Sequence, residues 1–235
     1  MSPIFHLEKC FSTNDEILSL LSEDESTAVF TYNQIQGRGQ YGKIWNIIPN
    51  QNLAYSLAVK ASEITVSNTF LNYYTAIIIR DFLANLTKSD SKIKWPNDII
   101  LNGKKVCGIL IEKKKVLSVE YYIIGIGINV LQTDFSNLPK AGSVLSVTGL
   151  SFDLNDFVNQ FHQYLISRMK DINSEEILNT YNYSLFRKGE ISVFQENDVR
   201  QNGIIKSADE NGFLWVDLEN EGLKKFFHKE IELLY

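Results

Sequence analysis

Lysine, arginine and several glycines are the residues of this chain whose types and spacing point most directly to chemistry. Lys94 stands before the segment Trp95-Pro96-Asn97-Asp98. Proline keeps the residue before it extended, and Pro-Asn-Asp favours a tight turn, so Lys94 is expected on a stiff segment. A lysine fixed in this way can bind an anion, although most lysines are simply solvated at the surface.

A set of glycines follows Lys94 in the chain. Residues 124–129 read Ile-Gly-Ile-Gly-Ile-Asn. Alternate side chains of a strand share a face, so the isoleucines predict a packed face, and Gly125 and Gly127 predict an opposite face of nearly bare backbone. Gly108 adds a bare position in the preceding apolar run. Such a group of glycines indicates either a closely packed helix or a ligand that lies against the backbone.

A second glycine-rich segment, GRGQYG, occupies residues 37–42. Its backbone N–H groups can approach phosphate oxygens, and Arg38 adds a positive charge. Many glycine-rich segments are only turns, so this loop alone is a weak signal.

Polar side chains also gather near the N-terminus, where Ser12-Thr13-Asn14 precedes a helical pattern in residues 17–21. Thr13 with Glu16 fits a capping box. A helix start also directs hydroxyl, amide and free N–H groups to one point. The segment therefore suits both a helix cap and a binding site.

The central stretch predicts an antiparallel meander of three strands. Asn102-Gly103 is a strong hairpin signal, and the polar run Lys113–Lys115 predicts a second, exposed turn. The apolar runs between them are Ile99–Leu101, Val106–Ile111 and Val116–Val130.

Three segments of this stretch, KWPNDI (94–99), KVCGILIE (105–112) and GIGINV (125–130), resemble the signature blocks of biotin protein ligases in their order and spacing. The resemblance covers essentially the whole chain. It implies an α+β fold with a mixed, largely antiparallel sheet and flanking helices, similar to class II synthetases and to the catalytic fold of biotin and lipoate ligases. A small C-terminal β-barrel like that of Src-homology-3 domains is implied as well.

The activity implied by the resemblance is ATP-dependent attachment of biotin to a lysine of a biotin carboxyl carrier domain, through biotinyl-5′-AMP. Lys94 and Arg38 are then the catalytic residues, which neutralise charge at the α-phosphate. The implied biotin site consists of Ser12, Thr13, Asn14, Gln34, Gly37, Arg38, Gly39, Gln40, Lys94, Gly108, Gly125 and Gly127. The implied adenylate site consists of Arg38, Gln40, Trp45, Lys94, Asn97 and Asn129.

Magnesium is expected with ATP, and either Asp98 or Asn129 would orient it. The family usually has a second arginine where this chain has Gln40, which removes one cation from the phosphate site. The catalytic pattern begins within the first fifteen residues. The form without an N-terminal DNA-binding helix-turn-helix is therefore expected.

Two alternatives remain open at this stage. One is a lipoate ligase or octanoyltransferase, which would share the fold and the acyl transfer to lysine. The other is a non-catalytic biotin-binding module that keeps the fold for regulation. The GRG and KWPNDI segments favour biotin, and the presence of both Lys94 and Arg38 favours catalysis.

The length and composition of the chain limit the class of protein and the partners that it can have. The 235 residues suffice for one ordinary domain with a small appendage, and 44% hydrophobic and 22% charged residues are typical of a soluble globular protein. A net charge of −5 argues against a DNA-binding face. No apolar run approaches the ~20 residues of a membrane span, and no signal peptide is evident. Cys10 and Cys107 lack metal-site spacing, which predicts free thiols in the cytoplasm, and the three histidines suggest no cluster.

The remaining pattern divides the chain near Arg187. Before it, strands are predicted at Ile4–Lys9, Ala28–Tyr32 and Leu53–Val59, and helices at Thr69–Leu86, Leu154–Met169 and from Ser174 to about Tyr183. After it, short alternating strands separated by glycine turns predict a small β-barrel, with strands at Ile191–Val193, Val199–Ile205, Phe213–Leu218 and Leu223–Phe227. We therefore predict a catalytic domain over residues 1–186 and a barrel over 187–235. About 50 residues make a marginal domain, so the barrel should dock on its neighbour.

Overall fold

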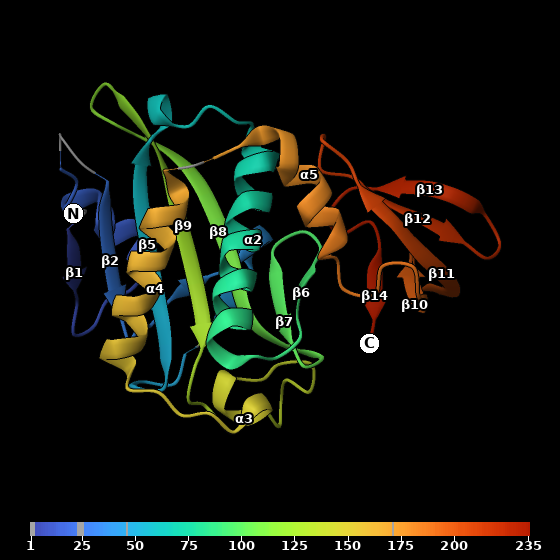
Figure 1. Cartoon of the computed structure of the whole chain (residues 1–235), viewed down its shortest axis with the longest axis horizontal. Coiled ribbons are helices and arrows are strands. Elements are labelled where there is room, and N and C mark those ends of the chain that lie inside the picture. Colours follow the sequence, from blue (N-terminus) through green and yellow to red (C-terminus); the bar gives the residue numbers. More distant parts are fainter. Residues whose placement is uncertain (1–2, 23–25, 46, 171) are drawn as a thin grey trace.

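A seven-stranded sheet forms the centre of the protein (Figure 1). The structure is a computed structural model, and it describes residues 3–22, 26–45, 47–170 and 172–235. The strand order is β1-β2-β5-β9-β8-β7-β6. β1 and β2 pair in parallel, and the other neighbouring strands pair antiparallel. The predicted mixed, largely antiparallel sheet is thus confirmed. Its strands are β1 (Ile4–His6), β2 (Thr27–Thr31), β5 (Asn52–Lys60), β6 (Ser91–Lys94), β7 (Asp98–Leu101), β8 (Lys104–Val116) and β9 (Val119–Asn129).

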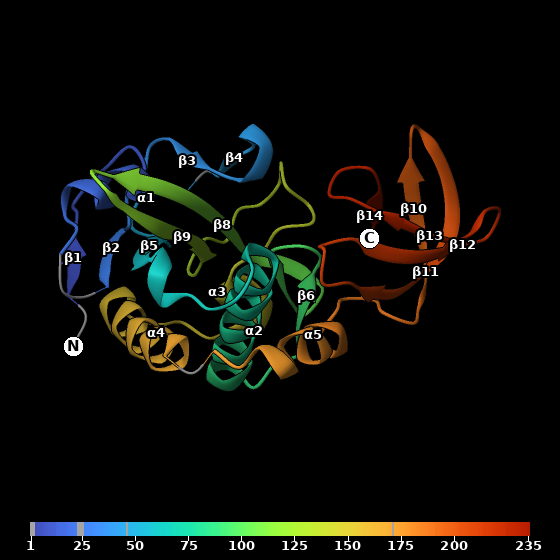
Figure 2. The ribbon, with the colours of Figure 1, turned by 90° about the horizontal axis from the view of Figure 1, so that it is seen from above.

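Three helices cover one face of this sheet, and short elements lie on the opposite face (Figure 2). The covering helices are α2 (Asn68–Thr87), α4 (Leu154–Met169) and α5 (Ser174–Tyr183), which match the predicted spans. Ser67 caps α2 and Asp153 caps α4 through side-chain oxygens that accept backbone N–H groups. The other face carries α1 (Thr13–Glu16) and the hairpin of β3 (Gly37–Arg38) and β4 (Ile44–Trp45). A short helix, α3 (Val144–Thr148), lies in the segment that follows β9.

The C-terminal residues form a five-stranded antiparallel sheet in the order β13-β12-β11-β10-β14. Apolar side chains of this sheet, such as Phe194 and Leu214, belong to the same buried cluster as those of α2 and β9. The Asn182 side chain of α5 also exchanges two hydrogen bonds with the backbone of Ala208, at 2.7 and 2.9 Å. The expected docking on the larger unit is therefore confirmed. The strands are β10 (Ile191–Glu196), β11 (Val199–Ala208), β12 (Leu214–Leu218), β13 (Gly222–Phe226) and β14 (Glu232–Leu234), the last of which was not predicted.

The second turn of the meander is not where the sequence predicted it. Lys113–Lys115 continue β8, and the chain reverses at Leu117-Ser118, where Val116 pairs with Val119. Leu117 has a φ of 54° and is 95% exposed. The lysines remain in the strand because their side chains reach water and cross-strand charges, as in the 2.9 Å ion pair between Lys113 and Glu120.

The helix that follows Ser12 is also shorter than its pattern suggested. It ends after α1 in a 3₁₀ turn at Ile17–Ser19. The predicted capping box is absent, because Ser12 is the N-cap residue and no side chain caps the helix. The Thr13 backbone N–H and hydroxyl instead both donate to Gln34 Oε1, at 2.9 and 3.2 Å. Side chains that could cap the helix are thus used in tertiary contacts.

Both cysteines are free, as the sequence predicted, and the structure shows that both are buried. Burial raises the pKa of Cys10 to about 11, and the carboxylate of Glu16 adds to the shift. Only about 0.1% of Cys10 is then thiolate at pH 8, and this fraction grows about tenfold per pH unit. We expect the native protein to react slowly with a disulfide reagent at pH 8, and about tenfold faster at pH 9. A rate that does not change with pH would contradict this.

Within the described part of the chain, no helix combines the length and the apolar character needed to cross a membrane.

Candidate active site

Three strands meet in a patch of sheet that carries almost no side chains. In the register of β5, β9 and β8, Gly127 lies between Ala54 and Gly108, and Gly125 follows on the same face. A methyl group at Gly127 would collide with the indole of Trp45, and one at Gly125 with the side chain of Asn14. The predicted bare face therefore exists, and it forms the floor of a cavity of about 160 Å³. We call Ala54, Gly108, Gly125 and Gly127 the glycine platform.

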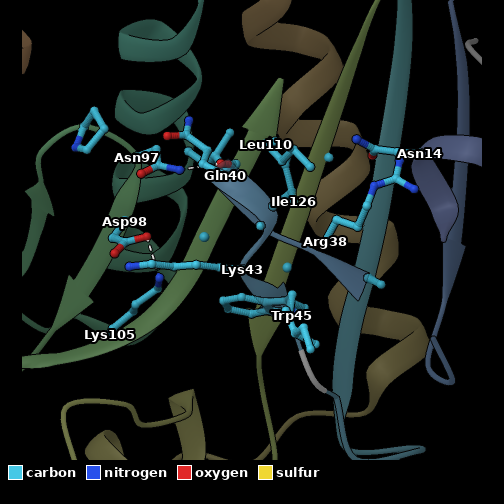
Figure 3. Close-up of a pocket in the computed structure, with 18 of the residues that line it drawn as sticks. Asn14, Arg38, Gln40, Lys43, Trp45, Asn97, Asp98, Lys105, Leu110 and Ile126 are labelled. Carbon is cyan, nitrogen blue, oxygen red and sulfur yellow. Dashed lines mark hydrogen bonds and ion pairs between the residues drawn. The ribbon is translucent and has the colours of Figure 1, made fainter. Parts of the chain in front are cut away.

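Trp45 reaches over the platform from β4 (Figure 3). Its indole lies against the positions that side chains at Gly108 and Gly127 would occupy. The indole Nε1 is buried and has no hydrogen-bond partner among the described residues. Leaving a buried donor unpaired costs about 1–3 kcal/mol. A ligand that accepts this hydrogen bond, or that displaces the indole, would remove the penalty.

One end of the cavity is lined by a buried polar network. Ser12, Thr13 and Asn14 are each only 4% exposed, and they line the cavity together with Gln34. The hydroxyl of Ser56, on β5, lies 2.8 Å from Thr13 Oγ1 and 2.6 Å from Asn14 Oδ1. The start of α1 therefore presents hydroxyl and amide groups in fixed positions, and such groups can both donate to and accept from a polar ligand.

The other end of the cavity holds positive charge around one carboxylate. The Nζ of Lys105 lies 2.6 Å from Asp98 Oδ1, and the Nζ of Lys94 lies 3.9 Å from Asp98 Oδ2. Burial lowers the pKa of Lys94, and the nearby Lys105, Lys43 and Lys140 lower it further. More cations than anions face this end, which suits an anionic ligand.

Arg38 points to the opposite end, beside Asn14 (Figure 3). Its guanidinium binds both carboxylate oxygens of Asp15, at 2.5 and 2.8 Å, and approaches Glu112 at 3.4 Å. The hydrogen bond from Arg38 holds the pKa of Asp15 below its ordinary value. The Arg38 and Asp15 side chains are 42% and 48% exposed, and such surface pairs contribute only about 0–1 kcal/mol. The arginine can thus leave Asp15 at little cost.

The cavity brings together most of the residues predicted for the site. It is lined by Ser12, Thr13, Asn14, Gln34, Arg38, Gly39, Gln40, Trp45, Lys94, Asn97, Asp98, Gly108, Gly125 and Gly127.

Two of the predicted residues lie elsewhere, and a third is already engaged. Gly37 is outside the lining, and a side chain there would collide with the Trp45 carbonyl and the Gln34 amide, so its smallness serves the β3–β4 pairing. Asn129 lines a neighbouring cavity, and its amide donates to the Gly142 carbonyl at 3.0 Å. Asn97 lines the site, but its amide donates to the Ile109 carbonyl at 2.6 Å.

The neighbouring cavity has a volume of about 620 Å³ and shares Lys94, Asp98 and Trp45 with the first. Lys43 and Lys105 line both cavities. The larger cavity adds apolar and charged side chains that the sequence did not single out: Ile47, Ile48, Phe135, Leu138, Lys140 and Tyr235.

Several residues that line the two cavities were not predicted from the sequence, and for most of them nothing in the local sequence marks a site. His228 lines the first cavity and Tyr235 the second, and both come from the C-terminal sheet. Lys105 carried a usable signal, since it begins the KVCGILIE block in a hairpin that returns beside Asp98. Ser56 carried none, because a serine in a buried strand is uninformative alone.

Residues that could hold a divalent cation are sparse. Among the described residues, no three His, Cys, Asp or Glu side chains gather in one place. Asp98 and Asn129 both line the larger cavity, but Lys105 already engages the Asp98 carboxylate. One carboxylate and one amide oxygen fit a magnesium ion that arrives with a triphosphate and keeps phosphate and water ligands.

The fold and the site define the class of the protein. The sequence pattern of the biotin/lipoate A/B protein ligase family matches residues 9–129, a span that contains α1, the glycine platform and Lys94. The chain belongs to this family.

Two members of this family and one solved structure are similar to the chain over most of its length. The biotin–[acetyl-CoA-carboxylase] ligase of Paracoccus denitrificans is 27% identical in an alignment of 220 positions that covers 88% of this chain and 91% of the relative. The bifunctional ligase/repressor BirA of Bacillus subtilis is 29% identical in an alignment of 221 positions that covers 89% of this chain and 66% of the relative. The solved biotin protein ligase of Aquifex aeolicus, in complex with biotin and ATP, matches with a TM-score of 0.80 at 23% identity, over 100% of this chain and 99% of that one. This chain therefore has the biotin protein ligase fold.

Proposed function

We propose that this protein activates biotin with ATP and transfers it to a lysine of a biotin carboxyl carrier domain. The observation that carries the proposal is the glycine platform, a bare floor between a buried polar network and a lysine cluster. A ligand with a polar uncharged head, an apolar chain and a carboxylate matches these three zones in order. Labelling of a purified carrier domain with biotin, in the presence of ATP, tests the proposal.

The polar network would bind the ureido group of biotin. Gln34, Thr13 and Asn14 offer both donors and acceptors, and the burial of Thr13 and Asn14 excludes competing water. The bicyclic head and its chain would then lie on the platform, where side chains at Gly125 and Gly127 would leave no room. Trp45 would move aside and cover the ligand.

Activation would take place at the lysine cluster. The biotin carboxylate attacks the α-phosphorus of ATP, the new C(O)O–P bond forms, and pyrophosphate leaves. Lys94 and its neighbours Lys105 and Lys43 are positioned to stabilise the charge that develops on the phosphate oxygens. Arg38 would join them after release from Asp15. The amine of the acceptor lysine then attacks the acyl carbon and AMP leaves.

The larger cavity is the proposed site of the nucleotide. Four lysines line it (Lys43, Lys94, Lys105 and Lys140), together with apolar side chains that suit a base. When bound, magnesium would neutralise part of the triphosphate charge, and Asp98 or Asn129 would hold the ion. We place the reaction in the cytoplasm, where Cys10 and Cys107 remain thiols.

The two-domain division is likewise a proposal, with the boundary between residues 186 and 187. Residues 187–235 contribute His228 and Tyr235 to the two cavities, but they contribute nothing to the described polar network. The C-terminal sheet would therefore serve the nucleotide and the activated intermediate, while biotin is recognised by the larger unit.

Gln40 leads to a prediction about the retention of the intermediate. A neutral amide lacks the bidentate, charge-assisted contact that arginine makes with phosphate. If Arg38 and Lys94 act without further help, Gln40→Arg should slow dissociation of labelled biotinyl-adenylate by about tenfold. This corresponds to ~1.4 kcal/mol, which is close to the lower end of the contribution of one hydrogen bond to a charged group, about 1.5–3 kcal/mol.

The structure also offers a cation that can substitute for arginine at this position. Lys43 lies three residues after Gln40 and lines both cavities. If Lys43 compensates, Lys43→Ala should raise the dissociation rate sharply, while Gln40→Arg should leave it unchanged. Both variants are measured at one ionic strength, because these contacts are ionic. A rate unaffected by either substitution would remove both residues from the phosphate site.

A further inference from the structure

The tip of the glycine-rich hairpin touches the C-terminal sheet. Tyr41 lies between β3 and β4, and the centre of its ring is 4.9 Å from the centre of the His228 ring. The Nζ of Lys229 lies 4.3 Å from the centre of the Tyr41 ring and 3.5 Å from the Tyr41 carbonyl oxygen. One tyrosine thus receives a ring contact, a cation–π contact and a hydrogen bond from two consecutive residues, 187 positions or more away in sequence.

The backbone on both sides of this contact is in an unusual conformation. Tyr41 has φ 56° and ψ 39°, and Lys229 has a φ of 78°. Side chains other than glycine rarely adopt the left-handed region, and residues held in such sparsely populated regions each cost on the order of 1–3 kcal/mol. Such conformations persist where surrounding contacts fix them. Here the two left-handed residues contact each other.

His228 connects this contact to the reacting end of the cavity. Its ring meets the ring of Trp95 edge-on, with centres 5.7 Å apart and planes at 89°. Burial lowers the pKa of His228 to about 4, with the Lys94 charge as the next cause. The imidazole is therefore neutral at physiological pH, and it packs between Tyr41 and Trp95 without repelling Lys229.

We propose that Tyr41, His228 and Lys229 form a latch that holds the glycine-rich hairpin closed over the activated intermediate. The hairpin carries Gln40, Lys43 and Trp45 over the cavity, and its other side is tied to α1 by the pair of Arg38 and Asp15. The latch residues act on the intermediate through the hairpin, so they are positioning residues. The role assigned to the latch rests on the proposed biotin activation, whereas the latch contact itself does not.

The rate at which labelled biotinyl-adenylate dissociates tests this role. A cation–π contact contributes little at an exposed site but is specific for charge and ring. Tyr41→Leu and Lys229→Met should each raise the dissociation rate about threefold to tenfold. Tyr41→Phe keeps the ring and Lys229→Arg keeps the charge, so both should release the intermediate at the wild-type rate.

A matched lysine provides the control. Lys225, on β13, makes the same kind of contact with Phe213, at 4.7 Å from the ring centre. Lys225→Met should leave dissociation unchanged. The double variant Tyr41→Leu/Lys229→Met should release the intermediate no faster than the faster single variant, because the two substitutions remove one contact. Additive effects, or equal rates in all variants, would overturn the latch.

A second measurement separates the latch from the proposed reaction. In ligand-free protein, amide hydrogen exchange of residues 37–43 should be at least threefold faster in Tyr41→Leu and Lys229→Met than in the wild type and in Lys225→Met. If exchange responds in this way but wild-type protein forms no adenylate, the contact exists and the proposed function fails. If adenylate forms and neither exchange nor dissociation responds, the latch fails alone.

Discussion

Lys94→Ala is expected to lower the rate of biotin-dependent exchange between ATP and pyrophosphate by about 100-fold or more, which is ~3 kcal/mol of lost transition-state stabilisation. Lys94 lines both cavities, and its ammonium lies at the end where we place the α-phosphate. Removing a preorganised cation weakens the stabilisation of charge that develops only during the reaction. The initial exchange rate at saturating biotin and ATP measures the effect.

The neighbouring Lys92 supplies the control. It lies on the same strand, β6, and pairs with Asp90 at 3.7 Å, at a side-chain exposure of 38%. Lys92→Ala removes the same charge from the same strand, and we expect the exchange rate to remain within about twofold of wild type. Near-normal exchange in a folded Lys94→Ala protein would refute the role of Lys94.

The charged form of Lys94 should also lower the free energy of unfolding. Burial lowers its pKa in the folded protein, so between that pKa and the ordinary value of 10.5 the unfolded chain binds more protons than the native state. The free energy of unfolding therefore rises with pH through this window, and below it the charged Lys94 is destabilising. Lys94→Met should consequently unfold at the same or a higher temperature than wild type at pH 7, while losing activity.

Gly127→Val is expected to abolish measurable biotin binding while the protein remains folded. The β-carbon alone would collide with the Trp45 indole, and a branched side chain would fill the floor between Ala54 and Gly108. Valine suits a strand better than glycine, so the sheet itself should tolerate the change. We expect the dissociation constant for biotin, measured by calorimetric titration, to rise at least 100-fold in Gly127→Val. The dissociation constant of Gly127→Ala should lie between those of the wild type and Gly127→Val.

Ile123 separates this effect from a general loss of stability. It lies on the same face of β9, two residues before Gly125, and packs against Ile17 outside the cavity. Ile123→Val should lower the free energy of unfolding by about 0.5–1.5 kcal/mol and leave biotin affinity unchanged. If Gly127→Val binds biotin as the wild type does, the ligand does not lie on the platform.

Much of the fold could be predicted from the sequence because its elements follow simple periods. The aromatic and aliphatic residues of α2 recur at helical spacing, and the alternation of isoleucine and glycine in residues 124–129 identified both faces of β9. The prediction failed where local signals conflict with tertiary contacts. Three consecutive lysines suggested a turn, yet the long hairpin of β8 and β9 places them in a strand with access to water and to Glu120.

The candidate site was predictable only where its residues fall in compact motifs. Lys94, the platform glycines and the start of α1 were found from short segments of sequence. His228 and Tyr235 reach the cavities because the C-terminal sheet docks against α5, which no local pattern indicates. The partner of Arg38 was also hidden, because no local pattern pairs Asp15 of α1 with the glycine-rich segment.

Exchange of labelled pyrophosphate into ATP by the wild-type protein measures directly whether this protein activates biotin. We expect this exchange to depend on added biotin and magnesium. With lipoate or octanoate at the same concentration in place of biotin, the exchange should be at least 100-fold slower. The Lys94→Ala protein serves as the negative control. Equal exchange with lipoate, or none with biotin from a folded protein, would contradict the account.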